Sequence, residues 1–74
     1  MLERIRNILS KYTKSDNILT ESILSTDLDL TSFDLVNIVA DFEDEFDIEI
    51  SDRDISTFVT VADIIAYLKI YAKE

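Results

Sequence analysis

Glycine, proline, cysteine and histidine are all absent from this sequence. Without cysteine there are no disulfides and no thiol nucleophile, and without histidine there is no imidazole base. Zinc sites built from these two residue types are therefore excluded. The lack of glycine also excludes glycine-rich phosphate loops and EF-hand loops, and it disfavours all-β folds that depend on tight primed turns.

The chain is short and has no long apolar run. Its 74 residues suffice for a single domain, which we place at residues 1–74. A domain of this size buries only about 60% of the surface that its unfolded chain exposes, so little interior is left for a catalytic cleft. We find no secretory leader and no stretch of roughly 20 apolar residues, and we expect a soluble, cytoplasmic protein without a membrane span.

Acidic residues dominate the charge, with 16 Asp and Glu against 7 Lys and Arg and a net charge of −9. This balance disfavours nucleic acid as a partner and favours proteins that carry basic patches. The hydrophobic content of 47% is too high for a disordered acidic chain. We therefore expect a folded, acidic domain.

The many carboxylates also raise the alternative of an enzyme that uses two acids, as in glycoside hydrolysis. A catalytic pair needs two different pKa values, and two carboxylates on a charged, solvated surface lack that difference. The chain is also too small for a substrate cleft. We interpret it as a binding or carrier module that is not an enzyme, and we assign no catalytic or metal-ligating residue.

The first half of the chain predicts one helix and a long ordered loop. The helix ends near the polar cluster Thr13–Asn17, and its apolar residues recur at helical spacing: Leu2, Ile5, Ile8, Leu9 and Tyr12. The connection that follows runs to Leu30, and long ordered loops in small domains are usually functional. Six apolar residues are expected to pin it to the core: Ile18, Leu19, Ile23, Leu24, Leu28 and Leu30.

Three capping boxes mark helix starts in the second half: Thr31–Asp34, Ser51–Asp54 and Thr60–Asp63. They predict helices of about 32–46, 52–57 and 60–72. The segment between the first two is expected to be extended, with Ile48 or Ile50 turned inward. The core face of the last helix is predicted to contain Val61, Ile64, Ile65, Leu68 and Tyr71.

The long helix has two apolar faces at about 100° per residue. One is the predicted core face: Leu35, Ile38, Val39, Phe42 and Phe46. The other contains Phe33, Val36 and Ala40, and Glu43 and Asp44 lie at its rim. This second face either packs against the long loop or forms an exposed apolar patch with an acidic rim, which is typical of a partner-docking surface.

Two strings in this region match a known pattern. The chain reads Leu28-Asp-Leu-Thr-Ser-Phe-Asp-Leu-Val36 and then Phe42-Glu-Asp-Glu-Phe-Asp-Ile-Glu-Ile50. In these strings, and onward to Leu68, it resembles the acyl carrier protein family, whose pattern is a leucine, a glycine, D-S-L, and an acidic helix that ends in E-E-F-D-I-E-I. The sequence departs from that pattern at five positions: Asp29 for the glycine, Thr31 for the aspartate, Phe33 for the leucine, Asn37 for an acid, and Ser51 for a proline.

The resemblance implies an all-α four-helix bundle with three longer helices, one short helix and a long first loop. It implies that a phosphopantetheinyl transferase attaches 4′-phosphopantetheine to Ser32, and that the thiol of this arm carries acyl groups as thioesters. Docking positions of the family correspond to Asp34, Val36, Ala40, Glu43 and Asp44. Positions that line the family's core correspond to Ile38, Phe42, Phe46, Ile50, Phe58, Ile64 and Leu68.

We therefore expect a monomeric acyl carrier for fatty acid or polyketide-type synthesis. Its partners would be the transferase and acyl ligase, acyltransferase or ketosynthase-type enzymes with basic patches. Phe33, next to the attachment point, is expected to contribute to partner choice. The alternative is a carrier-like acidic docking protein that is never modified, in which Ser32 is an ordinary serine at a helix start.

The acidic composition generates a first prediction. Repulsion among the carboxylates should weaken the folded state at low salt. We expect added salt or divalent cations to raise the melting temperature, measured by circular dichroism. A melting temperature that does not rise with salt would contradict this account of the charge.

Overall fold

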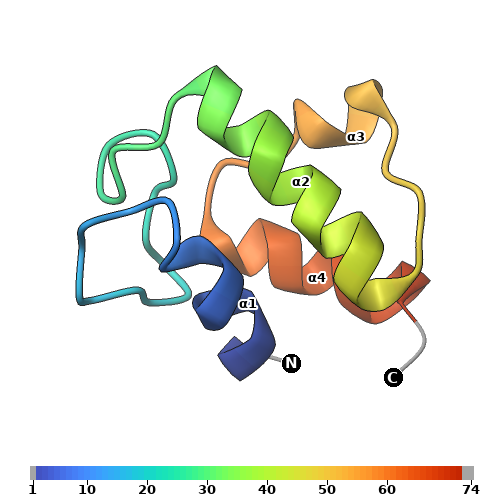
Figure 1. Ribbon diagram of the computed structural model, residues 1–74, viewed down its shortest axis with the longest axis horizontal. Helices are drawn as coiled ribbons and strands as arrows, with labels where there is room; N and C mark the ends of the chain where they lie inside the picture. The colour runs from blue at the N-terminus through green and yellow to red at the C-terminus, as the bar shows by residue number, and fades with distance from the viewer. Residues whose placement is uncertain (1, 73–74) are drawn as a thin grey trace.

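The computed structural model describes residues 2–72. They form four helices: α1 Leu2–Leu9, α2 Ser32–Phe46, α3 Asp52–Ile55 and α4 Val61–Tyr71. Figure 1 shows α2 lying across the other helices, with α3 beside its first half and the long loop at the opposite side of the molecule. The predicted all-α bundle with one short helix is confirmed. Within residues 2–72 the one β-type contact is an isolated antiparallel bridge between Ile23 and Thr60.

Two of the three predicted capping boxes form in full. At α2 the Thr31 side chain accepts from the Asp34 N–H, and the Asp34 carboxylate accepts from the Thr31 N–H, at 3.1 and 3.0 Å. Thr60 and Asp63 do the same at α4. Such reciprocal bonds satisfy N–H groups that a helix start leaves without partners.

The predicted box at α3 is only half made. The Ser51 hydroxyl accepts from the Asp54 N–H at 3.2 Å. The Asp54 carboxylate does not reach back, because it accepts instead from the Tyr67 hydroxyl of α4 at 2.8 Å. α3 also ends at Ile55 and not at 57. The N–H groups of Thr57 and Phe58 donate to carbonyls three residues earlier, as in a 3₁₀ turn, and so the α-helical pattern stops.

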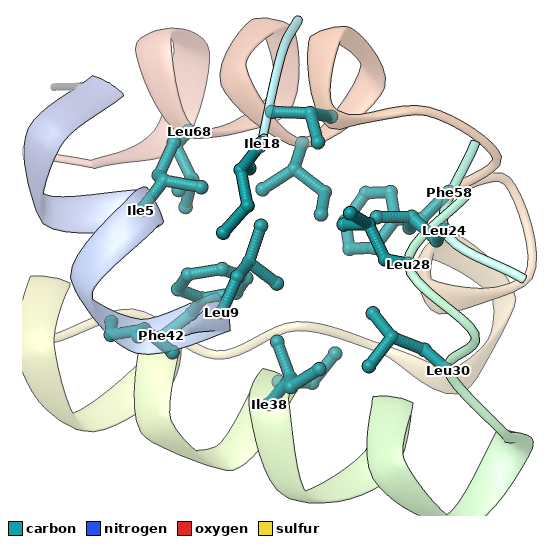
Figure 2. Close-up of a cluster of buried hydrophobic side chains, with 14 of the residues drawn as sticks. Ile5, Leu9, Ile18, Leu24, Leu28, Leu30, Ile38, Phe42, Phe58 and Leu68 are labelled. Atoms are coloured by element: carbon teal, nitrogen blue, oxygen red, sulfur yellow. The ribbon is translucent and has the colours of Figure 1, made fainter. Parts of the chain in front are cut away.

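One hydrophobic core joins α1, α2, α4 and the loop segments, and the partly buried Ile55 of α3 packs against it. Figure 2 shows core side chains from α1, α2, α4 and the connecting segments pointing toward one another. Four of the six predicted loop anchors are buried: Ile18, Leu24, Leu28 and Leu30. The seven positions expected to line the core are buried as well: Ile38, Phe42, Phe46, Ile50, Phe58, Ile64 and Leu68.

Three predicted core residues are exposed instead. Leu19 lies in a turn that the Ser22 hydroxyl closes by accepting from the Leu19 N–H, and this turn leaves its side chain at the surface. Ile23 uses its backbone in the bridge to Thr60, and its side chain faces outward. Tyr71 stacks on the outer side of Tyr67, with ring centroids 4.4 Å apart, and remains 55% exposed.

Backbone hydrogen bonds fix the long loop to the end of the molecule where α4 begins. The Leu24 N–H donates to the Val59 carbonyl at 2.9 Å, and the Ala62 N–H donates to the Thr20 carbonyl at 2.8 Å. The Leu30 N–H donates to the Leu24 carbonyl at 3.0 Å. These bonds set the position of the chain that enters α2.

α1 and the residues that follow it pack against one flank of α2 and bind two of its acids. Arg4 forms an ion pair with Glu45 at 2.9 Å and lies 4.3 Å from the centre of the Phe46 ring. The Tyr12 hydroxyl donates to the Asp41 carboxylate at 2.6 Å. Among residues 2–72, no helix is long and apolar enough to cross a bilayer.

Two aspartates occupy the left-handed region of backbone conformation. Asp29 has φ 53°, and Asp47, which ends α2, has φ 55°. Glycine adopts this conformation without steric cost, and among the other residues aspartate and asparagine tolerate it best. Asp29 stands at the family's glycine position, so the structure explains why glycine suits that position.

A second prediction follows for Asp29. Asp29→Gly should raise the free energy of unfolding by about 0.5–1 kcal/mol above that of Asp29→Asn, because relief of the left-handed strain exceeds the entropy that glycine loses. Both variants remove the charge, so their difference isolates the backbone effect. Urea unfolding measures it, and an Asp29→Gly protein no more stable than Asp29→Asn would argue against strain at this turn.

Candidate functional site

Ser32 is the first residue of α2 and lies directly after the Thr31 cap. Its side chain is exposed, and within residues 2–72 its hydroxyl makes no hydrogen bond. The N–H groups of Ser32 and Phe33 also lack partners within that range. The capping box thus fixes the helix start and leaves one hydroxyl and two N–H groups facing solvent.

Two hollows meet at Ser32. The loop-side hollow, about 180 Å³, is lined by Leu24, Ser25, Leu30, Thr31, Ser32, Leu35, Phe58 and Val59. The α3-side hollow, about 310 Å³, lies between α2 and α3 and is lined by Ser32, Leu35, Val36, Asp52, Ile55, Ser56 and Phe58. Ser32, Leu35 and Phe58 form the ridge between them.

The second apolar face of α2 is an exposed patch. Phe33 is 76% exposed, Val36 is 60% exposed, and Ala40 is exposed as well. The interpretation in which Phe33 and Val36 pack against the long loop is therefore wrong. The loop instead inserts Leu24 and Leu30 into the core behind α2, as Figure 2 shows.

The carboxylates of α2 differ in whether they already have hydrogen-bond or ion-pair partners within the protein. Asp34 completes the cap at Thr31, and the half-buried Glu43 accepts from the Ile50 N–H at 2.8 Å. Glu45 bonds to Arg4 of α1, and Asp41 accepts from the hydroxyl of Tyr12, which follows that helix. Asp44 is the one carboxylate of α2 with no hydrogen bond or ion pair inside residues 2–72.

α3 is held beside Ser32 by contacts with α4. No residue of α3 is buried. The Tyr67 ring packs edge-on against Phe58, with centroids 5.3 Å apart, while its hydroxyl bonds to Asp54. Burial and this hydrogen bond raise the pKa of Tyr67 to about 12. Neither contact was predicted, because no local pattern links Asp54 to a residue thirteen positions later.

Across residues 2–72, no group of three or more His, Cys, Asp or Glu side chains is arranged to hold a metal ion. Comparison with known proteins is decisive for the family. A family model described as the phosphopantetheine attachment site matches residues 3–68. This chain belongs to the acyl carrier protein family.

Two relatives illustrate the similarity. An acyl carrier protein of Thermotoga maritima is 34% identical over 71 residues, which cover 93% of this chain and 88% of that protein. A solved structure from Mycobacterium tuberculosis, assigned as an acyl carrier protein, is 32% identical with a TM-score of 0.76, covering 93% of this chain and 89% of the other.

Acyl carrier proteins are carriers and not enzymes, and their prosthetic group is 4′-phosphopantetheine. The residues around Ser32 fit such a group. The serine hydroxyl is accessible, its neighbouring N–H groups favour an anion, and the hollows on each side have apolar walls that suit an uncharged chain.

The Tyr67 contact generates a third prediction. Because the folded pKa is raised from 10 to about 12, this phenol stabilises the fold fully below pH 10 and ceases to do so as the pH rises through about 12. The free energy of unfolding of Tyr67→Phe should therefore depend less on pH between these two values than that of the wild-type protein. Denaturant unfolding across this range measures it.

Tyr12 remains in that variant, and its hydrogen bond to Asp41 raises its pKa as well, so part of the alkaline slope persists. An identical slope in the wild-type and Tyr67→Phe proteins would contradict the role given to Tyr67.

Proposed function

We propose that this chain carries acyl groups on a 4′-phosphopantetheine arm attached to Ser32. One observation carries the assignment: the hydroxyl of Ser32 is exposed and unpartnered within residues 2–72, at the capped start of α2. The position of Ser32 in the family's D-S-L pattern supports it, because Thr31 and Phe33 change the neighbours but keep the serine and the cap.

The chain's own residues prepare this attachment in two ways. The Thr31–Asp34 box holds the first turn of α2 in place, so the backbone that bears the Ser32 hydroxyl is fixed. The N–H groups of Ser32 and Phe33 lie at the helix start, where they would favour the negative charge of a phosphodiester on Ser32. The one titratable side chain that lines either hollow is Asp52, which is exposed and makes no hydrogen bond to Ser32, so we expect a base of the transferase to take the hydroxyl proton.

When bound, the arm supplies a thiol that holds acyl groups as thioesters. Fatty acid and polyketide-type synthesis both carry acyl groups in this way. We propose that the chain serves such a pathway in the cytoplasm, and that its 74 residues form a single carrier domain. Its partners would be a phosphopantetheinyl transferase and acyl ligase, acyltransferase or ketosynthase-type enzymes. Basic patches on these enzymes would complement the net charge of −9.

The docking surface that we propose begins beside Ser32 and follows the exposed stripe of α2. Phe33, Val36 and Ala40 would supply its apolar contact, and Asp44 the charge that remains available to a basic partner. Asp34 and Glu43 would mainly stabilise the fold and would bind a partner less directly, since each carboxylate already accepts from a backbone N–H. Recognition would then depend more on Phe33 than on charge next to the serine.

A fourth prediction tests the attachment. Incubation with coenzyme A and a broad-specificity transferase should raise the intact mass by one phosphopantetheine. Ser32→Ala should abolish this gain, and Ser25→Ala, which changes another exposed serine of the same hollow, should retain it. Circular dichroism should show both variants folded, because neither hydroxyl makes a hydrogen bond within residues 2–72.

Two outcomes would overturn the proposal. A wild-type mass that never changes with any transferase tested would favour the unmodified docking protein. A mass gain that persists in Ser32→Ala would place the attachment elsewhere.

A further inference from the structure

We propose that Arg53 of α3 is a docking residue for the phosphopantetheinyl transferase, and that it binds a carboxylate on that enzyme. This inference rests on the proposed modification of Ser32 and adds one contact with the partner that performs it. Arg53 is the only lysine or arginine between Lys14 and Lys69, and this part of the sequence contains most of the acids. A uniformly basic enzyme surface would therefore not match the molecule at this point.

The guanidinium group of Arg53 has no partner within the described part of the chain. Its side chain is exposed, and it makes no hydrogen bond or ion pair there. The two neighbouring acids are directed elsewhere, because the Asp54 carboxylate accepts from a tyrosine of α4 and Asp52 lines the α3-side hollow. By contrast, Arg4 and Arg6 both bond to groups of the protein itself. Arg53 is therefore an arginine that remains available to a partner.

Arg53 lies close to the group that the transferase must reach. Asp52, Ile55 and Ser56 line the hollow that begins at Ser32, and Figure 1 shows α3 beside the first half of α2. Arg53 follows Asp52 directly, so their Cα atoms lie about 3.8 Å apart. A specific interface covers about 800 Å² of each partner, which corresponds to a circle of roughly 16 Å radius. An enzyme centred on Ser32 therefore covers α3 as well.

An enzyme that covers this arginine without a partner for it would bind at a cost. The interface removes water from the guanidinium group, and an unpaired charge receives nothing in return. A carboxylate is the best-matched acceptor on a protein surface, because the planar guanidinium group donates two parallel hydrogen bonds to it. A basic side chain at the same place would repel Arg53. The enzyme surface that fits is thus basic opposite Asp44 and acidic opposite Arg53.

Two charge reversals provide a matched test. Arg53→Glu and Lys69→Glu each replace an exposed cation that has no partner in the described part of the chain. Lys69 belongs to α4, and no residue of that helix lines either hollow at Ser32. The enzyme is the transferase that loads the wild-type protein, as shown by intact mass. If no transferase loads the wild-type protein, the proposed function fails at this earlier step, which is distinct from a failure of this inference.

The first readout is the steady-state kinetics of loading. We expect Arg53→Glu to raise the KM for the carrier by about five-fold or more with kcat unchanged, because docking alone is affected. Lys69→Glu should change KM by less than about two-fold. The difference between the variants should shrink at high salt, because ions screen an exposed pair. Equal KM values for the two variants, or a lower KM for Arg53→Glu, would overturn the inference.

The second readout is a zero-length cross-link, which tests the contact itself. Arg53→Lys keeps the positive charge and supplies an amine that carbodiimide joins to a carboxylate in direct contact. Peptide mass spectrometry of the complex should identify an amide bond between position 53 and an Asp or Glu of the transferase. The wild-type complex is the control, because its guanidinium group does not react. Cross-links from Lys14 or Lys69 to the transferase, with none from position 53, would contradict the proposal even if KM changes.

Discussion

The backbone pairing between the long loop and the chain around Thr60 is the constraint on which the rest of the structure depends. Through it the loop delivers Leu24, Leu28 and Leu30 to the core and reaches α2 at a fixed point. Without these bonds, the loop would carry buried polar groups with no partners, at a cost comparable to that of lost hydrogen bonds. The position of Ser32 is therefore set by contacts made far from it in the sequence.

Local signals in the sequence were strong enough to predict the helices and the position of Ser32 at the start of α2. The capping boxes that begin at Thr31 and Thr60 each involve residues within a four-residue segment. The helical spacing of Ile38, Phe42 and Phe46 likewise predicts that these side chains are buried. Prediction was weaker where tertiary contacts compete with local ones. Asp54 was expected to cap its own helix, but Tyr67 takes its carboxylate.

Fewer carboxylates of α2 are available to a basic partner than the net charge of the sequence indicates. Net charge counts every acid equally, yet most acids of α2 accept hydrogen bonds or pair with α1, and Asp44 stands out because it does neither within residues 2–72. Which acids remain available depends on side-chain geometry that no residue count contains. A partner would meet an apolar stripe first and an isolated negative charge farther along.

The short helix α3 has a consequence for how the molecule fluctuates. It buries no residue, and its link to α4 includes a single side-chain hydrogen bond. Segments with so little buried contact open locally at much lower free energy than the core. Amide protons of α3 should therefore exchange with solvent long before those of α2, and this local opening would occur beside Ser32 while the core stays folded.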